Sequence, residues 1–264
     1  MAGLYFHIPF CRQKCPYCDF YSEVFNVDGL AGYVDALCRD LACSATWLGD
    51  EVFTTVFFGG GTPSLLQPTQ VERILDQVRQ RHVLASDAEI SMEVNPGTVD
   101  RVGLKGYRQA GVNRLSIGVQ SFDDDQLRWL QRIHDSRQAI DMVEGARWAG
   151  FERLNLDLMF ALPGQNEATV RQDCQRIAEL APEHVSIYGL SVEPQTPLAE
   201  REASGQWCQV AEEEYQQQYL VLSQQLEDHG YEHYEISNFC RPDTIRAIGS
   251  GSRIWGSEPG RTVL

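Results

Sequence analysis

The chain has 264 residues, a formal net charge of −15 at pH 7, and a composition that is 43% hydrophobic and 22% charged. This length can bury a large core, as one α/β barrel-like domain or as two smaller domains. The composition is typical of a globular protein. The acidic balance argues against nucleic acid as the main partner, because phosphate binding needs clustered Lys and Arg. It also argues against docking on an anionic membrane surface.

The hydropathy pattern and the cysteines indicate a cytoplasmic location. No run approaches the roughly 20 apolar residues that cross a bilayer. The first residues enter a predicted strand, with neither a basic region nor a cleavage site before it. We therefore expect no transmembrane segment. Eight cysteines, three of them in one short cluster, favour a reducing compartment over a disulfide framework.

Strands and helices alternate in the sequence as far as Leu190. Strands are predicted over 4–8, 52–58, 89–94, 114–119, 154–159 and 185–190. Helices are predicted over 29–47, after Pro68, and over 99–110, 124–130, 137–149 and 168–180. Six β–α units in series imply a parallel sheet with outer helices, as a partial (β/α)6 barrel or an open doubly wound sheet. In either form the chemistry gathers at the carboxyl ends of the strands.

Three regions follow from this pattern. We expect the barrel to occupy residues 1–200. Residues 201–240, with a helix over 211–227, are expected to form the start of a post-barrel region. Residues 241–264 are rich in Gly, Ser and Arg and have no period, so an irregular tail is expected there.

Cys11, Cys15 and Cys18 form a C-x3-C-x2-C triplet on the loop after the first predicted strand. A structural zinc and a conventional iron–sulfur cluster each take four ligands, so this triplet is one ligand short. Three thiols can hold three corners of a [4Fe–4S] cluster and leave the fourth iron open to a small molecule. One alternative is a zinc site with His7 as fourth ligand, in which case the protein is a zinc-binding structural domain. The other is that the three cysteines are plain buried thiols.

A glycine run, Gly59-Gly60-Gly61-Thr62-Pro63, directly follows the second predicted strand. Three glycines let the backbone turn with positive φ and approach a ligand closely. Taken alone, the run is also compatible with an ordinary tight turn between strand and helix.

The triplet, with His-Ile-Pro-Phe before it, resembles the radical S-adenosylmethionine (SAM) superfamily over residues 4 to 240. Within it, the chain is most similar to the branch of the oxygen-independent coproporphyrinogen dehydrogenases and HemW-type heme chaperones. The resemblance implies a partial (β/α)6 barrel with a helical extension after the sixth strand. It also implies that the open iron takes the amino and carboxylate groups of SAM, and that an electron from the cluster cleaves SAM to a 5′-deoxyadenosyl radical.

Matching the family motifs along the chain also implies a SAM site. The implied contact positions are Tyr5, Gly60, Gly61, Thr62, Glu93, Gln120, Arg132 and Asp157. Glu93 suits a ribose hydroxyl, and Arg132 can hold the SAM carboxylate with a bidentate fork. Taken singly, Glu93 could instead cap a helix, Arg132 could form a surface ion pair, and Asp157 could be a buried polar residue.

The residue at position 20 distinguishes the coproporphyrinogen dehydrogenases from the heme chaperones. The dehydrogenases carry a fourth cysteine two residues after the triplet, where this chain has Phe20. Cys-Asp-Phe, Gly-Val-Gln-Ser-Phe and Tyr-Glu-Ile-Ser-Asn-Phe resemble the chaperones instead. This implies heme as cargo, respiratory heme-acceptor proteins as partners and an electron donor for the cluster, with the coproporphyrinogen oxidase as the alternative. No catalytic residue is assigned, and the heme ligand is unknown, since His7, His134 and His233 are not distinguishable.

The resemblance stops shortly after Phe239. The family continues with a His-Asn and Tyr-Trp signature and a helical C-terminal domain, whereas from about Asp243 this sequence is unrelated. We therefore expect a truncated or frameshifted product that lacks the C-terminal domain, and in which heme handover is impaired.

Overall fold

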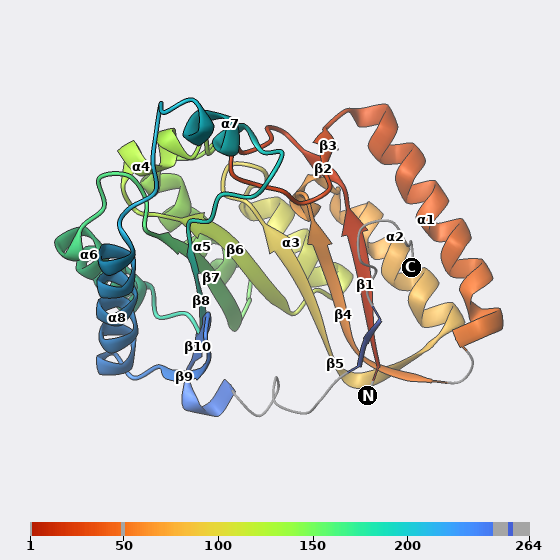
Figure 1. The fold of residues 1–264 in the computed structure, drawn as a ribbon. Helices are drawn as coiled ribbons and strands as arrows, with labels where there is room; N and C mark the ends of the chain where they lie inside the picture. The colour runs from red at the N-terminus through yellow and green to blue at the C-terminus, as the bar shows by residue number, and fades with distance from the viewer. Residues whose placement is uncertain (1, 49–50, 245–252, 256–264) are drawn as a thin grey trace.

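The computed structural model describes residues 2–48, 51–244 and 253–255. Its main sheet has nine strands in the order β11-β1-β4-β5-β6-β7-β8-β10-β9 (Figure 1). These strands are β1 (Ala2–Ile8), β4 (Val52–Gly60), β5 (Val83–Val94), β6 (Arg114–Gln120), β7 (Arg153–Phe160), β8 (His184–Gly189), β9 (Glu232–Glu235), β10 (Asn238–Cys240) and β11 (Arg253–Trp255).

The strand order confirms the predicted fold class. Strands β1, β4, β5, β6, β7 and β8 are parallel and neighbour one another in chain order. A doubly wound sheet would reverse its order at a switch point, and these six strands do not. Antiparallel β10 flanks β8, and parallel β11 flanks β1, so in the described part of the chain the barrel is partial.

Helices pack along the outer side of the sheet (Figure 1). The helices are α1 (Val27–Leu48), α2 (Pro68–Arg81), α3 (Arg101–Ala110), α4 (Asp124–Trp129), α5 (Ser136–Trp148), α6 (Glu167–Leu180), α7 (Pro197–Ala203), α8 (Glu212–Asp228) and the 3-10 turns η1 (Pro63–Leu65) and η2 (Pro242–Thr244). Helix α1 packs on α2, α2 on α3, α3 on α5, and α6 on α8. In Figure 1, α1 and α2 lie at the right of the sheet and α6 and α8 at the left.

Local sequence sets the ends of these helices. At the start of α5, Asp135 Oδ1 accepts a hydrogen bond from the Gln138 backbone N–H, and Gln138 Oε1 accepts one from the Asp135 backbone N–H. Helix α3 ends at Gly111, whose φ of 116° lies in the left-handed region that suits glycine. The predicted helices therefore have ordinary start and stop signals.

The two faces of the sheet differ in chemistry because side chains alternate along each strand. The outer face, under the helices, is apolar, and its buried residues include Phe6, Phe58, Met92, Leu115, Ile117, Leu154, Leu156, Val185 and Ile187. The inner face carries polar side chains, and these are Ser91, Glu93, Arg114, Ser116, Asn155, Asp157, His184 and Ser186.

Several elements were not predicted. They are the small parallel sheet of β2 (Phe10–Cys11) and β3 (Glu23–Val24), helix α7, and the hairpin β9–β10. In the stretch 241–264, where an irregular tail was expected, the described elements are η2 and β11, and β11 pairs with β1. The rest of that stretch lies outside the described residues, and the division into three regions stays a prediction.

Candidate functional site

The cysteine loop is anchored to three separate connections at the carboxyl ends of the strands. Arg12 donates to the backbone carbonyl of Gly97 (2.9 Å), and Gln13 donates to that of Gln131 (3.1 Å). The Leu198 backbone N–H donates to the Pro16 carbonyl (2.9 Å). Long-range contacts therefore fix the position of the three thiols.

The glycine run lies directly against this loop. The Gly61 N–H donates to the Ile8 carbonyl (2.9 Å). A Cβ at Gly61 would stand only 2.8 Å from the Phe10 carbonyl oxygen and 3.0 Å from that of Ile8. Gly60 has a φ of 112°, and a Cβ there would meet the His7 ring at 2.7 Å. The absence of side chains is thus required for the run to approach the cysteine loop.

Two cysteine sulfurs are joined by a chain of side-chain hydrogen bonds. The Thr62 hydroxyl donates to Cys11 Sγ (3.5 Å) and accepts from Asn95 Nδ2 (3.1 Å). Asn95 Oδ1 accepts from Arg132 Nη2, and Arg132 Nη1 donates to Cys15 Sγ (3.7 Å). We call this chain, from Cys11 through Thr62, Asn95 and Arg132 to Cys15, the thiol arc. It brings two predicted site residues, Thr62 and Arg132, and the unpredicted Asn95 onto the cysteine loop.

One nitrogen of the Arg132 guanidinium, Nε, has no hydrogen-bond partner. Its Nη2 donates to the Gly118 carbonyl (2.9 Å) as well as to Asn95, and its Nη1 is taken by Cys15. Arg132 Nε is buried and has no hydrogen-bond partner. The bidentate contact with a SAM carboxylate stays a prediction, and the structure leaves Nε available for a ligand acceptor.

The carboxyl groups of Glu93 and Asp157 are neighbours on the inner face of the sheet. Glu93 Oε2 accepts from the Gly60 N–H (3.1 Å), so it lies beside the glycine run. Burial and the neighbouring Asp157 raise the pKa of Glu93 to about 8. Burial also raises the pKa of Asp157 to about 6, although hydrogen bonds from Asn155 and Ser116 act in the opposite direction. Buried acids with raised pKa values are typical of functional sites.

Tyr5 lies in the middle of β1 and not at its end as expected, whereas Gln120 is the last residue of β6. The Tyr5 hydroxyl hydrogen-bonds His7 Nδ1 (3.1 Å), and its ring stacks on Phe57. Burial and Glu93 raise the pKa of Tyr5 to about 12. Gln120 has a φ of 69° and follows an irregularity in the β6–β7 pairing. Such left-handed backbone at a non-glycine residue concentrates at functional sites.

The three candidate heme ligands lie in different surroundings. Both ring nitrogens of His7 are engaged, since Nδ1 faces Tyr5 and Nε2 faces the Tyr21 carbonyl (2.9 Å). His134 is buried, and burial lowers its pKa to about 4. His233 lies on β9 and stacks on Phe239, with ring centroids 4.3 Å apart. The structure does not bring these histidines together.

The arrangement argues against a zinc site built from the triplet and His7. Among the described residues, no group of three or more His, Cys, Asp and Glu side chains is placed to hold a single metal ion. Zinc ligands converge on one ion, whereas each thiolate of a [4Fe–4S] cluster binds a different iron. Both His7 ring nitrogens are engaged in hydrogen bonds, to Tyr5 and to the Tyr21 carbonyl.

Several polar residues of the site were not predicted. Asn95 completes the thiol arc, and Ser116, Asn155 and His184 surround Asp157. A signal for the last three exists in the sequence. Strands of a parallel sheet normally read as continuous apolar runs, but polar and apolar residues alternate over 114–117 of β6, 153–158 of β7 and 184–187 of β8. That alternation predicts a polar inner face.

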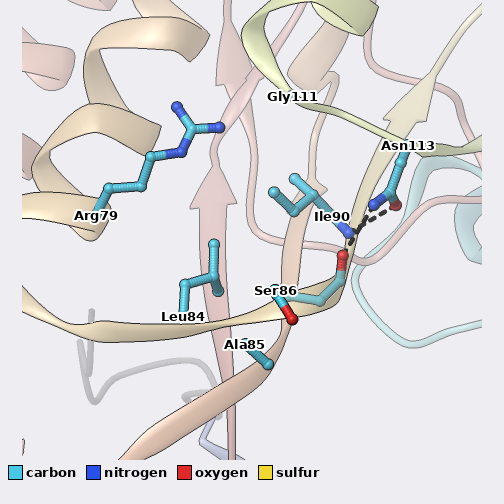
Figure 2. Close-up of a pocket in the computed structure, with 8 residues that line it drawn as sticks. Arg79, Leu84, Ala85, Ser86, Ile90, Gly111 and Asn113 are labelled. Carbon is cyan, nitrogen blue, oxygen red and sulfur yellow. Dashed lines mark hydrogen bonds between the residues drawn. The ribbon is translucent and has the colours of Figure 1, made fainter.

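A pocket of about 350 Å³ lies at the other end of the sheet (Figure 2). Its lining comes from the start of β5, from Gly111 and Asn113 before β6, and from Arg79 of α2. Asn113 bonds the backbone of Ile90 and Ala88, and Arg79 bonds the Ala110 carbonyl. These polar groups support the backbone, so the pocket is not part of the candidate site.

Parallel strands in chain order, a triplet of cysteines after the first strand and a glycine run after the second define the protein class. The Radical SAM superfamily model matches residues 5–177, and the chain belongs to that superfamily. Its family therefore implies a [4Fe–4S] cluster and SAM as cofactors.

The particular relatives are heme chaperones. The chain is 40% identical over 241 residues to the heme chaperone HemW of Escherichia coli, covering 91% of this chain and 63% of that protein. It is 41% identical over 247 residues to HemW of Synechocystis, covering 91% and 60%. Among solved structures it is similar to the E. coli coproporphyrinogen III oxidase HemN, a radical SAM enzyme, with a TM-score of 0.82 and 30% identity over 94% of this chain and 57% of that one.

The chain thus spans about three fifths of the length of the curated relatives that it matches. In the part of the chain that the structure describes, no helix is long and apolar enough to cross a membrane.

Proposed function

We propose that Cys11, Cys15 and Cys18 hold a [4Fe–4S] cluster, and that the adjoining strand ends bind SAM. The thiol arc carries this proposal. It joins two of the three thiols to Thr62 and Arg132, two residues that the family motifs place against SAM. One hydrogen-bonded unit would then contact both cofactors.

The residues present fit such a ligand. The glycine run has no side chains to obstruct a ligand, Arg132 Nε is a buried donor without a partner, and Glu93 and Asp157 offer carboxyl oxygens to hydroxyl groups. The bound cluster would supply the electron for reductive cleavage of SAM. The chain itself would orient the ligand through Gly60, Gly61, Gln120 and Tyr5, the remaining positions of the predicted site.

The full function that we propose is that of a heme chaperone, which binds heme as cargo and delivers it to acceptor proteins in the cytoplasm. The similarity to HemW proteins supports it. The electron donor for the cluster and the heme acceptors would be its protein partners. Phe20 supports the chaperone as well, because it is 65% exposed beside the triplet and cannot ligate a metal.

A second candidate rests on the likeness to HemN. That likeness supports an oxygen-independent coproporphyrinogen III oxidase activity on the same site. An anaerobic assay for decarboxylation of the porphyrinogen, run beside a hemin titration, separates the two. Stable hemin binding without decarboxylation is expected, and decarboxylation would favour the oxidase.

The cofactor proposal is tested on protein purified and reconstituted without oxygen. Iron, sulfide and zinc are measured, and SAM binding is followed by equilibrium dialysis. About four irons and four sulfides per chain, with SAM retained, are expected. About one zinc and no sulfide would contradict the cluster.

A further inference from the structure

A buried chain of hydrogen bonds runs from the edge hairpin to Asp157. Tyr234 on β9 places its hydroxyl 2.7 Å from His184 Nε2, and His184 Nδ1 lies 2.6 Å from Asn155 Oδ1. Asn155 Nδ2 donates to Asp157 Oδ1 (2.7 Å) and to the Ser116 hydroxyl (2.8 Å). Ser116 in turn donates to Asp157 Oδ2 (3.2 Å). We call the residues Tyr234, His184, Asn155 and Ser116 the carboxylate relay.

The protons in this relay have one consistent assignment. Asn155 must turn its amide nitrogen toward Asp157, because its oxygen would otherwise face a carboxylate. Asn155 Oδ1 then faces His184, so His184 must be protonated at Nδ1. Its Nε2 is therefore an acceptor, and the Tyr234 hydroxyl donates to it. Each residue thus donates toward the carboxylate.

Burial makes this order rigid. Asn155, His184 and Ser116 are all buried side chains, and Tyr234 is the partly exposed end of the chain, on the hairpin. Asn155 pairs with His184 in register across β7 and β8. Burial lowers the pKa of His184 to about 3, so the ring stays neutral at physiological pH. A neutral imidazole has one donor and one acceptor nitrogen. It therefore accepts from Tyr234 and donates to Asn155, and not the reverse.

We infer that His184 and Tyr234 are positioning residues that act through Asn155 to hold the Asp157 carboxylate toward the SAM ligand. This inference rests on the proposed function, since it gives Asp157 a ligand. The relay supplies one donor to each oxygen of Asp157, from Asn155 and from Ser116, and a carboxylate oxygen can accept more than one hydrogen bond. It also connects the hairpin, which lies after the six-stranded barrel, to the ligand site.

The test is SAM affinity of the full chain with a reconstituted cluster. His184→Ala removes the shorter of two hydrogen bonds to Asn155 Oδ1 (2.6 Å) and leaves the one from the Ser186 hydroxyl (3.2 Å). It should weaken SAM binding about fivefold, the effect of one lost hydrogen bond. His184→Asn should restore affinity to within about twofold, because its amide nitrogen stands as far from the backbone as Nδ1. Tyr234→Phe should weaken binding about twofold or more.

Tyr231→Phe is the matched control. Tyr231 follows α8, just before β9, and its hydroxyl donates to the Pro182 carbonyl (2.8 Å), outside the relay. Its removal should leave SAM affinity unchanged at a similar cost in stability. A His184→Asn variant as weak as His184→Ala, or no loss in either, would overturn the inference while SAM binding by the unaltered chain stands. If the unaltered chain does not bind SAM, the proposed function fails, and this inference with it.

A measurement on the unaltered protein removes any dependence on variants that fold poorly. In ¹⁵N-histidine-labelled protein, NMR should show His184 as the neutral Nδ1–H tautomer. The Nε2–H tautomer would break the relay and overturn the inference.

Discussion

The two faces of the six parallel strands have opposite chemistry although they come from the same residues in alternation. The outer face is a continuous apolar core under the helices, with Phe6 and Phe58 in ring contact at its β1–β4 side. The inner face places Asp157, Asn155 and His184 side by side on β7 and β8. The outer face stabilises the sheet by burying apolar area, whereas the inner face carries the polar groups of the proposed ligand site. Changes to the outer face should therefore act on stability, and changes to the inner face on cofactors.

The largest effect is expected at the cysteine loop. Cys15→Ala removes one of the three proposed cluster ligands, so the reconstituted chain should lose essentially all iron and sulfide. Cys208→Ala, at an exposed cysteine before α8, is the control and should keep both. Iron and sulfide analysis reads the result. A full complement of iron in Cys15→Ala would refute the assignment.

A pair of truncations compares the two faces directly. Phe58→Ala empties a fully buried outer-face position and should cost about 3–5 kcal/mol of unfolding free energy. Ser116→Ala on the inner face removes one hydrogen bond to Asp157 and should cost about 1 kcal/mol. Urea denaturation of both variants measures this. Equal losses would show that the faces do not divide their roles as proposed.

The inner face should also make stability depend on pH. The pKa of Glu93 rises from 4.5 to about 8 on folding, so between these values the folded state holds a proton that the unfolded state has lost. Stability from this group is present below pH 4.5 and is lost as pH rises to about 8. Glu93→Gln should flatten that slope in ligand-free protein.

Denaturation midpoints at pH 5.5, 7 and 8.5 check this slope. Glu72→Gln, at an exposed position on α2, is the matched control and should keep the slope of the unaltered chain. A Glu93→Gln variant that keeps the slope would mean that Glu93 is not buried as an acid.

A further pair of variants compares two glycines, one against the cysteine loop and one on the open side of α1. Gly61→Ala places a Cβ within 3.0 Å of backbone atoms of the cysteine loop and should cost about 1–3 kcal/mol. Gly32→Ala in α1 has no atom within 4 Å of its new Cβ and should stabilise the helix by up to about 1 kcal/mol. Thermal unfolding distinguishes the two. Stabilisation by Gly61→Ala would contradict the close approach of the glycine run to the loop.

Much of the barrel could be predicted because apolar periodicity and helix caps are local signals. The six strands and the helices between them follow from runs such as 52–58 and from caps such as Asp135. The hairpin β9–β10 was missed, since β9 is exposed along its length and has no apolar alternation.

The site was only partly predictable. Motifs identified Cys11, the glycine run and Asp157, but not what joins them. Asn95 links Thr62 to Arg132 from three different loops, and no spacing in the sequence encodes that contact. Tyr234 reaches His184 across fifty positions of sequence. Such pairings depend on strand register, which appears only in the folded chain.

Electron paramagnetic resonance of the reduced, reconstituted chain, with and without SAM, tests the central claim most directly. If the triplet leaves one iron open beside the inner face, SAM will change the cluster signal, and Cys208→Ala will show the same change. A cluster signal that SAM leaves identical would contradict a shared site for cluster and ligand.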